Sequence, residues 1–363
     1  MNLLKTIAPA LMAILLAPML DAQDTAAIDL LLDDAAKVEP GDAEAWVKVR
    51  DQIVAMGEGA LPALKAAGAD EKWTEQAWPR ALAAEACRAR IELPQFVEVV
   101  EHPPGINPEH YAKFRKPAPT CVRELVHPGK QLVPMLLERW RWTLDQHAFS
   151  KGEAGKAERD ALAHALLYAP GFHADSRARF ALLAALNDKA LPDTWRSDAA
   201  VSYGQTGGRE ALKVLNAFVD DGGNPLPVRE ACAGAIGWVA EDAAYDAIEA
   251  RLANTELPGH AKLIPALVNG LGILGARLGW QARGVMAKEQ GERIRENCAR
   301  LLVGTLKAHP QHGAFIGQQL QVVAWNQSLD WIKELSKDGE NEAVRAAARD
   351  IIDPLTLTLS RYK

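Results

Sequence analysis

The spacing of apolar residues between positions 193 and 253 predicts α-helices. Ala211, Val214, Leu215, Phe218 and Val219 follow the i, i+3, i+4, i+7, i+8 pattern of one helix face. A second apolar stripe with helical spacing comprises Val228, Ala231, Cys232, Ala235, Ile236 and Val239. Polar and proline-containing segments separate the two stripes. The region therefore consists of consecutive amphipathic helices.

This pattern returns with a period of about 33 residues. Gly204 and Gly237 are 33 residues apart, and Gly237 and Gly272 are 35 apart. Arg196 and Arg229 each precede a glycine of this series by eight residues. Each unit thus comprises two helices, the first ending near a glycine, which we expect to take a positive φ as a helix C-cap. Leu-Pro dipeptides, typical of helix starts, fall at 191–192, 226–227 and 257–258.

One such helix pair cannot bury its apolar face alone, so a fixed period predicts stacked units. The segments WRSDAAVSYGQTGGREALKVLNAFV and VREACAGAIGWVAEDAAYDAIEARL resemble HEAT repeats, and more narrowly the HEAT-like repeats also found in phycobilin lyases. AMGEGALPALKAAG resembles the second half of another copy, and VRAAARDIID the first half of a last one. The resemblance implies an all-α fold, an α-solenoid in which HEAT-like helix pairs form a superhelical stack.

These patterns divide the chain into six segments. We expect a signal peptide at 1–22, N-terminal HEAT-like repeats at 23–100, a proline-rich irregular loop at 101–121, divergent helical pairs at 122–190, HEAT-like repeats at 191–353 and a C-terminal tail at 354–363. In the tail, Leu355, Leu357 and Leu359 alternate with polar residues as in a strand.

The first residues have the layout of a secretory signal peptide. A basic start, MNLLK, precedes the apolar run TIAPALMAILLAPML, and we place cleavage after Ala22. The run is shorter than the roughly 20 residues of a membrane-spanning helix, and Pro9 and Pro18 interrupt it. We therefore expect an exported protein, periplasmic or extracellular, that has no membrane insertion after cleavage.

An exported chain can form disulfides, yet four cysteines in 363 residues are too few for a disulfide framework. Cys232 lies on an apolar helical stripe, which favours a small buried side chain. If one bridge forms, Cys87–Cys121 is the expected pair, because the other pairs are further apart in the sequence.

Charge and motifs exclude several functions. The net charge is −6, and no basic stripe is present that could neutralise nucleic-acid phosphates or an anionic membrane. No GxSxG, Walker-type, GxGxxG or CxxCH motif occurs. The histidine pairs His102/His110 and His309/His312 lack a recognisable metal-site spacing. We therefore predict no catalytic residue, cofactor or metal, and no nucleic-acid partner.

The proline-rich segment is the predicted binding site. His110, Tyr111, Phe114 and Arg115 combine aromatic rings with arginine, as protein-binding hot spots do. The alternative is that the two aromatic rings fix the loop to the helices beneath it.

Two further features bear on binding. Trp140 and Trp142 are two positions apart on one predicted helix, so one of them is expected to be exposed. The repeated arginines Arg196, Arg229 and Arg345 could line a groove for an acidic partner. The other reading, which we favour, is that they bond to groups of the adjacent repeat.

The function that follows is a non-catalytic protein–protein interaction scaffold. It would bind a protein or peptide through its concave helical surface or through the 101–121 loop. Two alternatives remain open, a HEAT-like repeat enzyme of the lyase type and a structural spacer in an envelope assembly. Nothing in the sequence requires more than a monomer.

Overall fold

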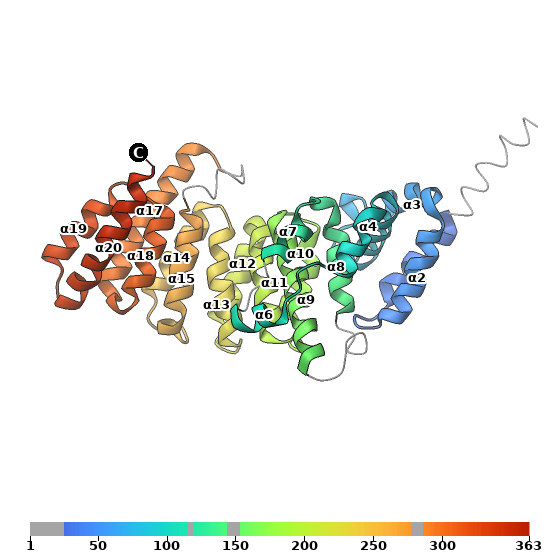
Figure 1. Ribbon diagram of the computed structural model, residues 1–363, viewed down its shortest axis with the longest axis horizontal. Coiled ribbons are helices and arrows are strands. Elements are labelled where there is room, and N and C mark those ends of the chain that lie inside the picture. The colour runs from blue at the N-terminus through green and yellow to red at the C-terminus, as the bar shows by residue number, and fades with distance from the viewer. Residues whose placement is uncertain (1–24, 115–118, 144–152, 277–285, 363) are drawn as a thin grey trace, which may run out of the picture. The chain divides into compact units, whose positions relative to one another are not determined.

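The computed structural model is all-helical in its described residues, which confirms the all-α part of the predicted fold (Figure 1). It describes residues 25–114, 119–143, 153–276 and 286–362, and these contain no β-strand. The chain divides into two compact units, residues 1–184 and 185–363, called here the N-terminal and C-terminal units. The predicted signal peptide lies outside the described residues.

The N-terminal unit begins with helical residues 25–37. Its further helices are α2 (Ala43–Ala55), α3 (Leu61–Ala67), α4 (Trp78–Glu92), α5 (Val97–Glu101), α6 (Pro108–Phe114), α7 (Pro119–Val126), α8 (Val133–Trp142) and α9 (Glu153–Phe172). α4 packs against α2, α3 and α8, and α8 also packs against α9. Their core includes Ile28, Leu32, Trp46, Ile53, Leu64, Cys87 and Trp142. α10 (Ala178–Asn187) leads into the C-terminal unit.

The described residues of the proline-rich segment 101–121 include two short helices, so the prediction that the whole segment is an irregular loop is wrong. Pro108 and Pro119 are the first residues of α6 and α7. Proline fits the first turn of a helix, because its missing N–H has no intrahelical partner there. Both short helices pack against α9. The prolines therefore divide the segment into two short helices.

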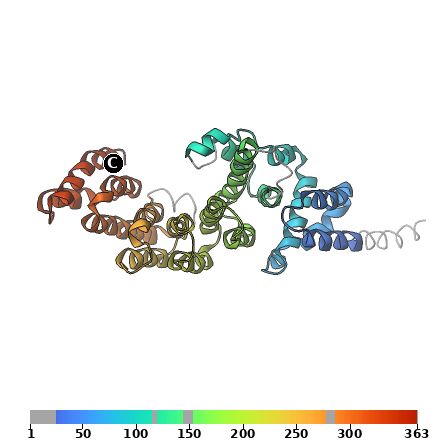
Figure 2. The same ribbon diagram turned by 90° about the horizontal axis from the view of Figure 1, so that it is seen from below.

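The C-terminal unit contains α11 (Asp193–Thr206), α12 (Gly208–Asp220), α13 (Leu226–Ala235), α14 (Asp242–Ala253), α15 (His260–Leu274), α17 (Lys288–Ala308), α18 (Gly313–Val323), α19 (Ser328–Asp338) and α20 (Glu342–Ser360). α11, α13, α15, α18 and α20 form one row, each packed against the next. α14, α17 and α19 form a second row, and α12 packs against α11 and α13. Figure 2 views several of these helices nearly along their axes.

The repeated glycines lie where the sequence predicts, at the ends of α11 and α13, but for a different reason. Neither Gly204 nor Gly237 has a positive φ, so the C-cap explanation is wrong. A β-carbon on Gly204 would lie 2.6 Å from the carbonyl oxygen of Ala235 in the next helix of the row. One on Gly237 would collide with the backbone of Gly270. These glycines therefore allow consecutive helices to approach closely.

The repeated arginines bond to the backbone, as the favoured reading of the sequence predicts. Arg196 and Arg229 are buried and Arg345 is half-buried, and each guanidinium donates to a carbonyl at the end of the preceding helix. The acceptors, in the same order, are the oxygens of Leu186, Val219 and Gly339, at 3.0, 2.7 and 2.7 Å. Carbonyls at a helix C-terminus lack intrahelical donors and attract cations. The three arginines therefore have a structural role.

The C-terminal tail is not strand-like. α20 continues to Ser360 and includes the segment predicted to alternate as a strand. Leu355 and Leu359 are four residues apart, share a helix face and are buried, whereas Leu357 is 58% exposed. Leu355 and Leu359 thus belong to one buried helix stripe, and Leu357 lies outside it.

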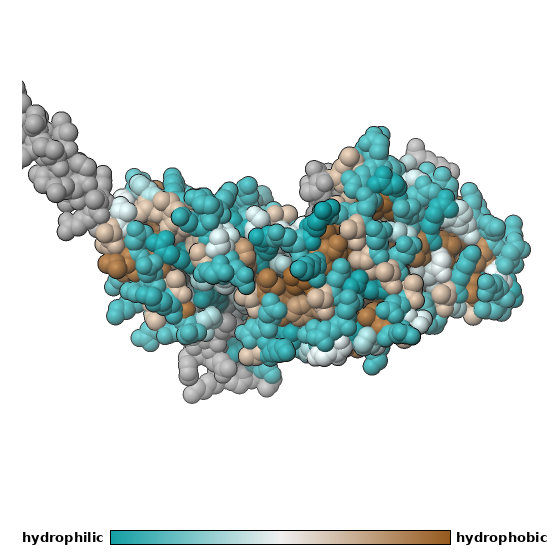
Figure 3. Space-filling model, turned by 180° about the vertical axis from the view of Figure 1, so that it is seen from behind, coloured by the Kyte–Doolittle hydropathy of each residue, from teal (hydrophilic) through white to brown (hydrophobic). Residues whose placement is uncertain are grey.

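The four cysteines are all buried and free, so Cys87–Cys121, the pair expected if one bridge forms, is not bonded. Among the described helices, none is long and apolar enough to span a membrane. Figure 3 shows one face of the molecule, on which hydrophilic side chains surround separate hydrophobic patches. The large exposed apolar residues in the described ranges are Leu30, Val47, Met56, Phe172, Val322, Leu357 and Tyr362.

Candidate functional site

Three of the predicted binding residues of the 101–121 segment, His110, Tyr111 and Phe114, belong to α6. His110 is half-buried, and its backbone N–H donates to Asn107 Oδ1 at 2.8 Å. Tyr111 and Phe114 belong to α6, but their side chains lie outside what the structure describes, as does all of Arg115. α6 packs against α9, but the side chains that would bind a partner or fix the segment are not described. Both the binding role and the fixing role therefore remain predictions for these residues.

Trp140 and Trp142 are both buried, at 4% and 5% exposure, so the expectation that one is exposed is wrong. The helix that carries them, α8, packs against α4 and against α9, and it therefore has no face open to solvent at these positions. Trp142 stacks on Trp46, with ring centroids 5.3 Å apart and an interplanar angle of 12°. Neither indole is accessible to a partner in this structure.

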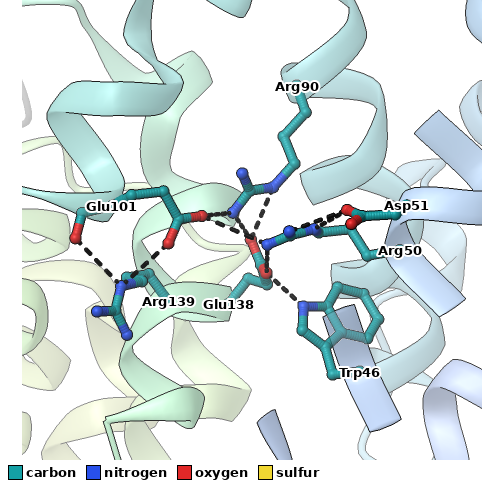
Figure 4. Close-up of polar contacts among 7 residues, drawn as sticks. All are labelled: Trp46, Arg50, Asp51, Arg90, Glu101, Glu138 and Arg139. Carbon is teal, nitrogen blue, oxygen red and sulfur yellow. Dashed lines mark hydrogen bonds and ion pairs between the residues drawn. The ribbon is translucent and has the colours of Figure 1, made fainter. Parts of the chain in front are cut away.

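The same helix α8 carries a buried carboxylate at the centre of a charged cluster (Figure 4). Glu138 is 2% exposed and accepts two bonds from Arg90, at 2.7 and 3.2 Å. The indole N–H of Trp46 also donates to Glu138, and Arg50 lies 3.9 Å away. Glu138 thereby ties α8 to α2 and α4.

A second carboxylate, Glu101 at the end of α5, completes the cluster. It accepts from Arg90 at 2.5 Å and from Arg50 at 3.4 Å, and it pairs with Arg139 at 3.3 Å. Burial alone would lower the pKa of Arg90, but the charges of Glu138 and Glu101 outweigh it and raise that pKa. Burial lowers the pKa of Arg139, and Glu101 offsets part of this effect.

The cluster is better suited to hold helices together than to perform chemistry. Arginines engage both carboxylates, so neither is free to act as a general acid or base. The sequence analysis missed the cluster because its members come from four helices and show no fixed spacing. A signal existed in α4, where Arg90 closely follows the alanine-rich run ALAAEAC.

A polar cavity of about 400 Å³ lies elsewhere in the N-terminal unit. Its lining residues are Asp70, Arg88, Lys130, Gln131, Asp175, Ser176 and Arg177. Buried Glu85 adjoins it, pairing with Arg88 at 2.9 Å and with Arg177 at 2.8 Å. Burial raises the pKa of Glu85. Both of its oxygens are engaged by arginine, as in the cluster around Glu138.

A groove of about 320 Å³ lies between α17 and α19 in the C-terminal unit. Its lining residues are Arg300, Val303, Gly304 and Lys307 of α17 and Trp331, Glu334, Leu335 and Asp338 of α19. The guanidinium carbon of Arg300 lies 4.4 Å from the centroid of the Trp331 ring, and Arg300 also pairs with Glu296 at 2.6 Å. The groove therefore combines an aromatic ring with charges of both signs.

Metal ligands do not come together in the described part of the chain. No group of three or more His, Cys, Asp or Glu side chains there could hold a metal ion. The ring of His309 lies 6.1 Å from that of His260 and 6.5 Å from that of His312, measured between centroids. Burial, together with the other two histidines, lowers the pKa of His309.

Comparison with protein-family models found no match for this chain. Comparison with curated proteins found no match either. The resemblance to HEAT repeats therefore remains a prediction from the residues quoted above, and functional inference rests on the geometry of the chain itself.

Proposed function

We propose that the protein is an exported, non-catalytic α-solenoid of HEAT-like repeats that serves as a protein–protein interaction scaffold. The observation that carries the proposal is the row α11, α13, α15, α18 and α20, in which each helix packs on the next. Arg196 and Arg229 occupy equivalent positions 33 residues apart and make the same kind of backbone bond. Such regularity is typical of repeat proteins, whose stacked units form extended binding surfaces.

Binding takes place on the concave helical surface or on the 101–121 segment. The burial of Trp140 and Trp142 argues against including them in the contact set. The absence of a catalytic role is supported by the carboxylates Glu85, Glu101 and Glu138, all of which are paired with arginine. Export is compatible with the four free thiols, because burial shields them from oxidants.

Crosslinking mass spectrometry with an amine-reactive reagent tests the proposal, because the 101–121 segment and the helical surface formed by α17 and α19 both carry exposed lysines. Lys113 lies on α6, and Lys307 and Lys337 lie on α17 and α19. Lys65, on α3, belongs to neither candidate surface and serves as the control position. In native extract we expect one partner to crosslink at Lys113 or at the α17/α19 pair, but not at Lys65. If no protein crosslinks at these positions, the scaffold proposal fails.

A further inference from the structure

The groove between α17 and α19 owes its depth to Gly304. Gly304 lies inside a 21-residue helix, four residues before its last residue Ala308, and glycine is among the least favourable residues in a helix interior. A β-carbon added to it would meet no atom within 4 Å, so packing does not require glycine here. At Gly204, by contrast, the backbone of the next helix excludes a side chain. Glycine at 304 therefore leaves an open hollow, and local rules of this kind are most often broken at functional sites.

The lining of this hollow defines what could occupy it. Its floor is apolar, because Val303 and Leu335 are almost fully buried beside Gly304. The indole of Trp331 forms part of one wall, already covered on one face by Arg300. A large apolar side chain inserted above Gly304 would contact Val303, Leu335 and Trp331 and would fill the hollow between them.

Unpaired charges flank the floor on both walls. Lys307 of α17 forms no ion pair with any described residue, and neither do Glu334 and Asp338 of α19. Arg300 is already engaged by Glu296 and Trp331. One wall thus offers a free cation and the other offers two free carboxylates, which favours an occupant with an acidic and a basic group.

We propose that this groove binds a partner peptide in which one large apolar side chain is flanked by an acidic residue on one side and a basic residue on the other. The apolar side chain lies over Gly304, the acidic residue pairs with Lys307, and the basic residue pairs with Asp338 and Glu334. This inference rests on the proposed function as a scaffold for a protein or peptide.

An array of synthetic nine-residue peptides tests the inference with the full chain. The central residue is Gly, Ala, Leu, Phe or Trp, and the flanking residues are Glu, Lys or Gln in all combinations. We expect binding only with a large apolar centre and one flank of each charge. Gly304→Leu fills the hollow and should weaken binding at least tenfold. Gly59→Leu is the matched control, because a β-carbon there also meets nothing within 4 Å.

A charge exchange gives a second, independent readout. In the triple variant Lys307→Glu/Glu334→Lys/Asp338→Lys, which exchanges the charges of the two walls, the preferred order of the acidic and basic flanks should invert. Far-UV circular dichroism checks that each variant is folded. Binding that Gly304→Leu leaves unchanged, or a flank preference that the exchange does not alter, overturns the inference.

The failure of this inference is distinguishable from the failure of the scaffold proposal. If the array gives no binding while a partner still crosslinks at Lys113, the groove is not the site but the scaffold remains. If the array gives no binding and no lysine crosslinks, both proposals fail.

Discussion

Replacing Glu138 by glutamine removes one charge from the cluster in Figure 4 and puts an NH2 group in place of one of its two oxygens. Glutamine has nearly the same shape as glutamate and keeps an oxygen that can accept from the Trp46 indole N–H. The change therefore removes the charge that faces Arg90, whose side chain is only 5% exposed, together with the oxygen that accepts two bonds from it. We expect this variant to destabilise the N-terminal unit.

The size of the effect follows from what remains around Arg90. Removing one partner of a buried ion pair typically destabilises a protein by about 3–5 kcal/mol, because the other charge stays buried. Glu101 still lies 2.5 Å from Arg90 after the change, so some compensation is retained. We therefore expect the low end of this range, about 3 kcal/mol.

Urea unfolding followed by near-UV circular dichroism measures this loss, because the stacked Trp46–Trp142 pair reports on the N-terminal unit. Glu98→Gln is the control, since Glu98 is exposed, has no ion pair among the described residues and should change stability by less than about 0.5 kcal/mol. In an Arg90→Met background, Glu138→Gln should lose most of its effect. Equal midpoints for Glu138→Gln and Glu98→Gln would refute the reasoning.

Four further predictions concern stability and reactivity. Gly204→Ala should lower the free energy of unfolding by about 1–2 kcal/mol, because the added methyl group overpacks against the next helix. Gly304→Ala should raise this free energy by about 0.5–1 kcal/mol, because alanine favours the helix and meets no other atom. Thermal unfolding of the two variants compares these effects. Arg229→Met leaves two backbone carbonyls without their donor and should lose about 1–3 kcal/mol in urea unfolding, against almost nothing for Arg209→Met on the surface. Burial raises the pKa of Glu85, so the folded state binds the proton of this carboxyl group more tightly than the unfolded state does. The stability of the wild-type protein should therefore fall as pH rises above 4.5. Denaturation midpoints measured across this pH range should fall less for Glu85→Gln. Burial also raises the pKa of all four thiols, so a colorimetric thiol reagent should react rapidly with them only after unfolding.

Local periodicity was enough to predict helices α11 to α14 of the C-terminal unit. The apolar stripe that starts at Ala211 is the buried face of α12, and the 33-residue spacing of Arg196 and Arg229 reflects equivalent bonds in successive units. The glycines were placed correctly but explained wrongly. The contact of Gly204 with Ala235 joins residues 31 positions apart, which no local pattern reveals.

The N-terminal unit was less predictable because its important contacts are non-local. Arg90 and Glu138 are 48 residues apart and belong to helices whose pairing has no sequence signature. The expectation for Trp140 and Trp142 assumed that one face of α8 is open to solvent, whereas helices cover it on two sides. The groove of the C-terminal unit was missed for a similar reason, since it depends on the contact between α17 and α19.

The most direct test of the central claim is hydrogen–deuterium exchange of the full chain with and without the best-binding peptide of the array. The account predicts slower amide exchange in residues 288–308 and 328–338, the helices α17 and α19, and no such change in Gly304→Leu at the same peptide concentration. Protection confined to α6 and α7, or equal protection in Gly304→Leu, would contradict binding in this groove.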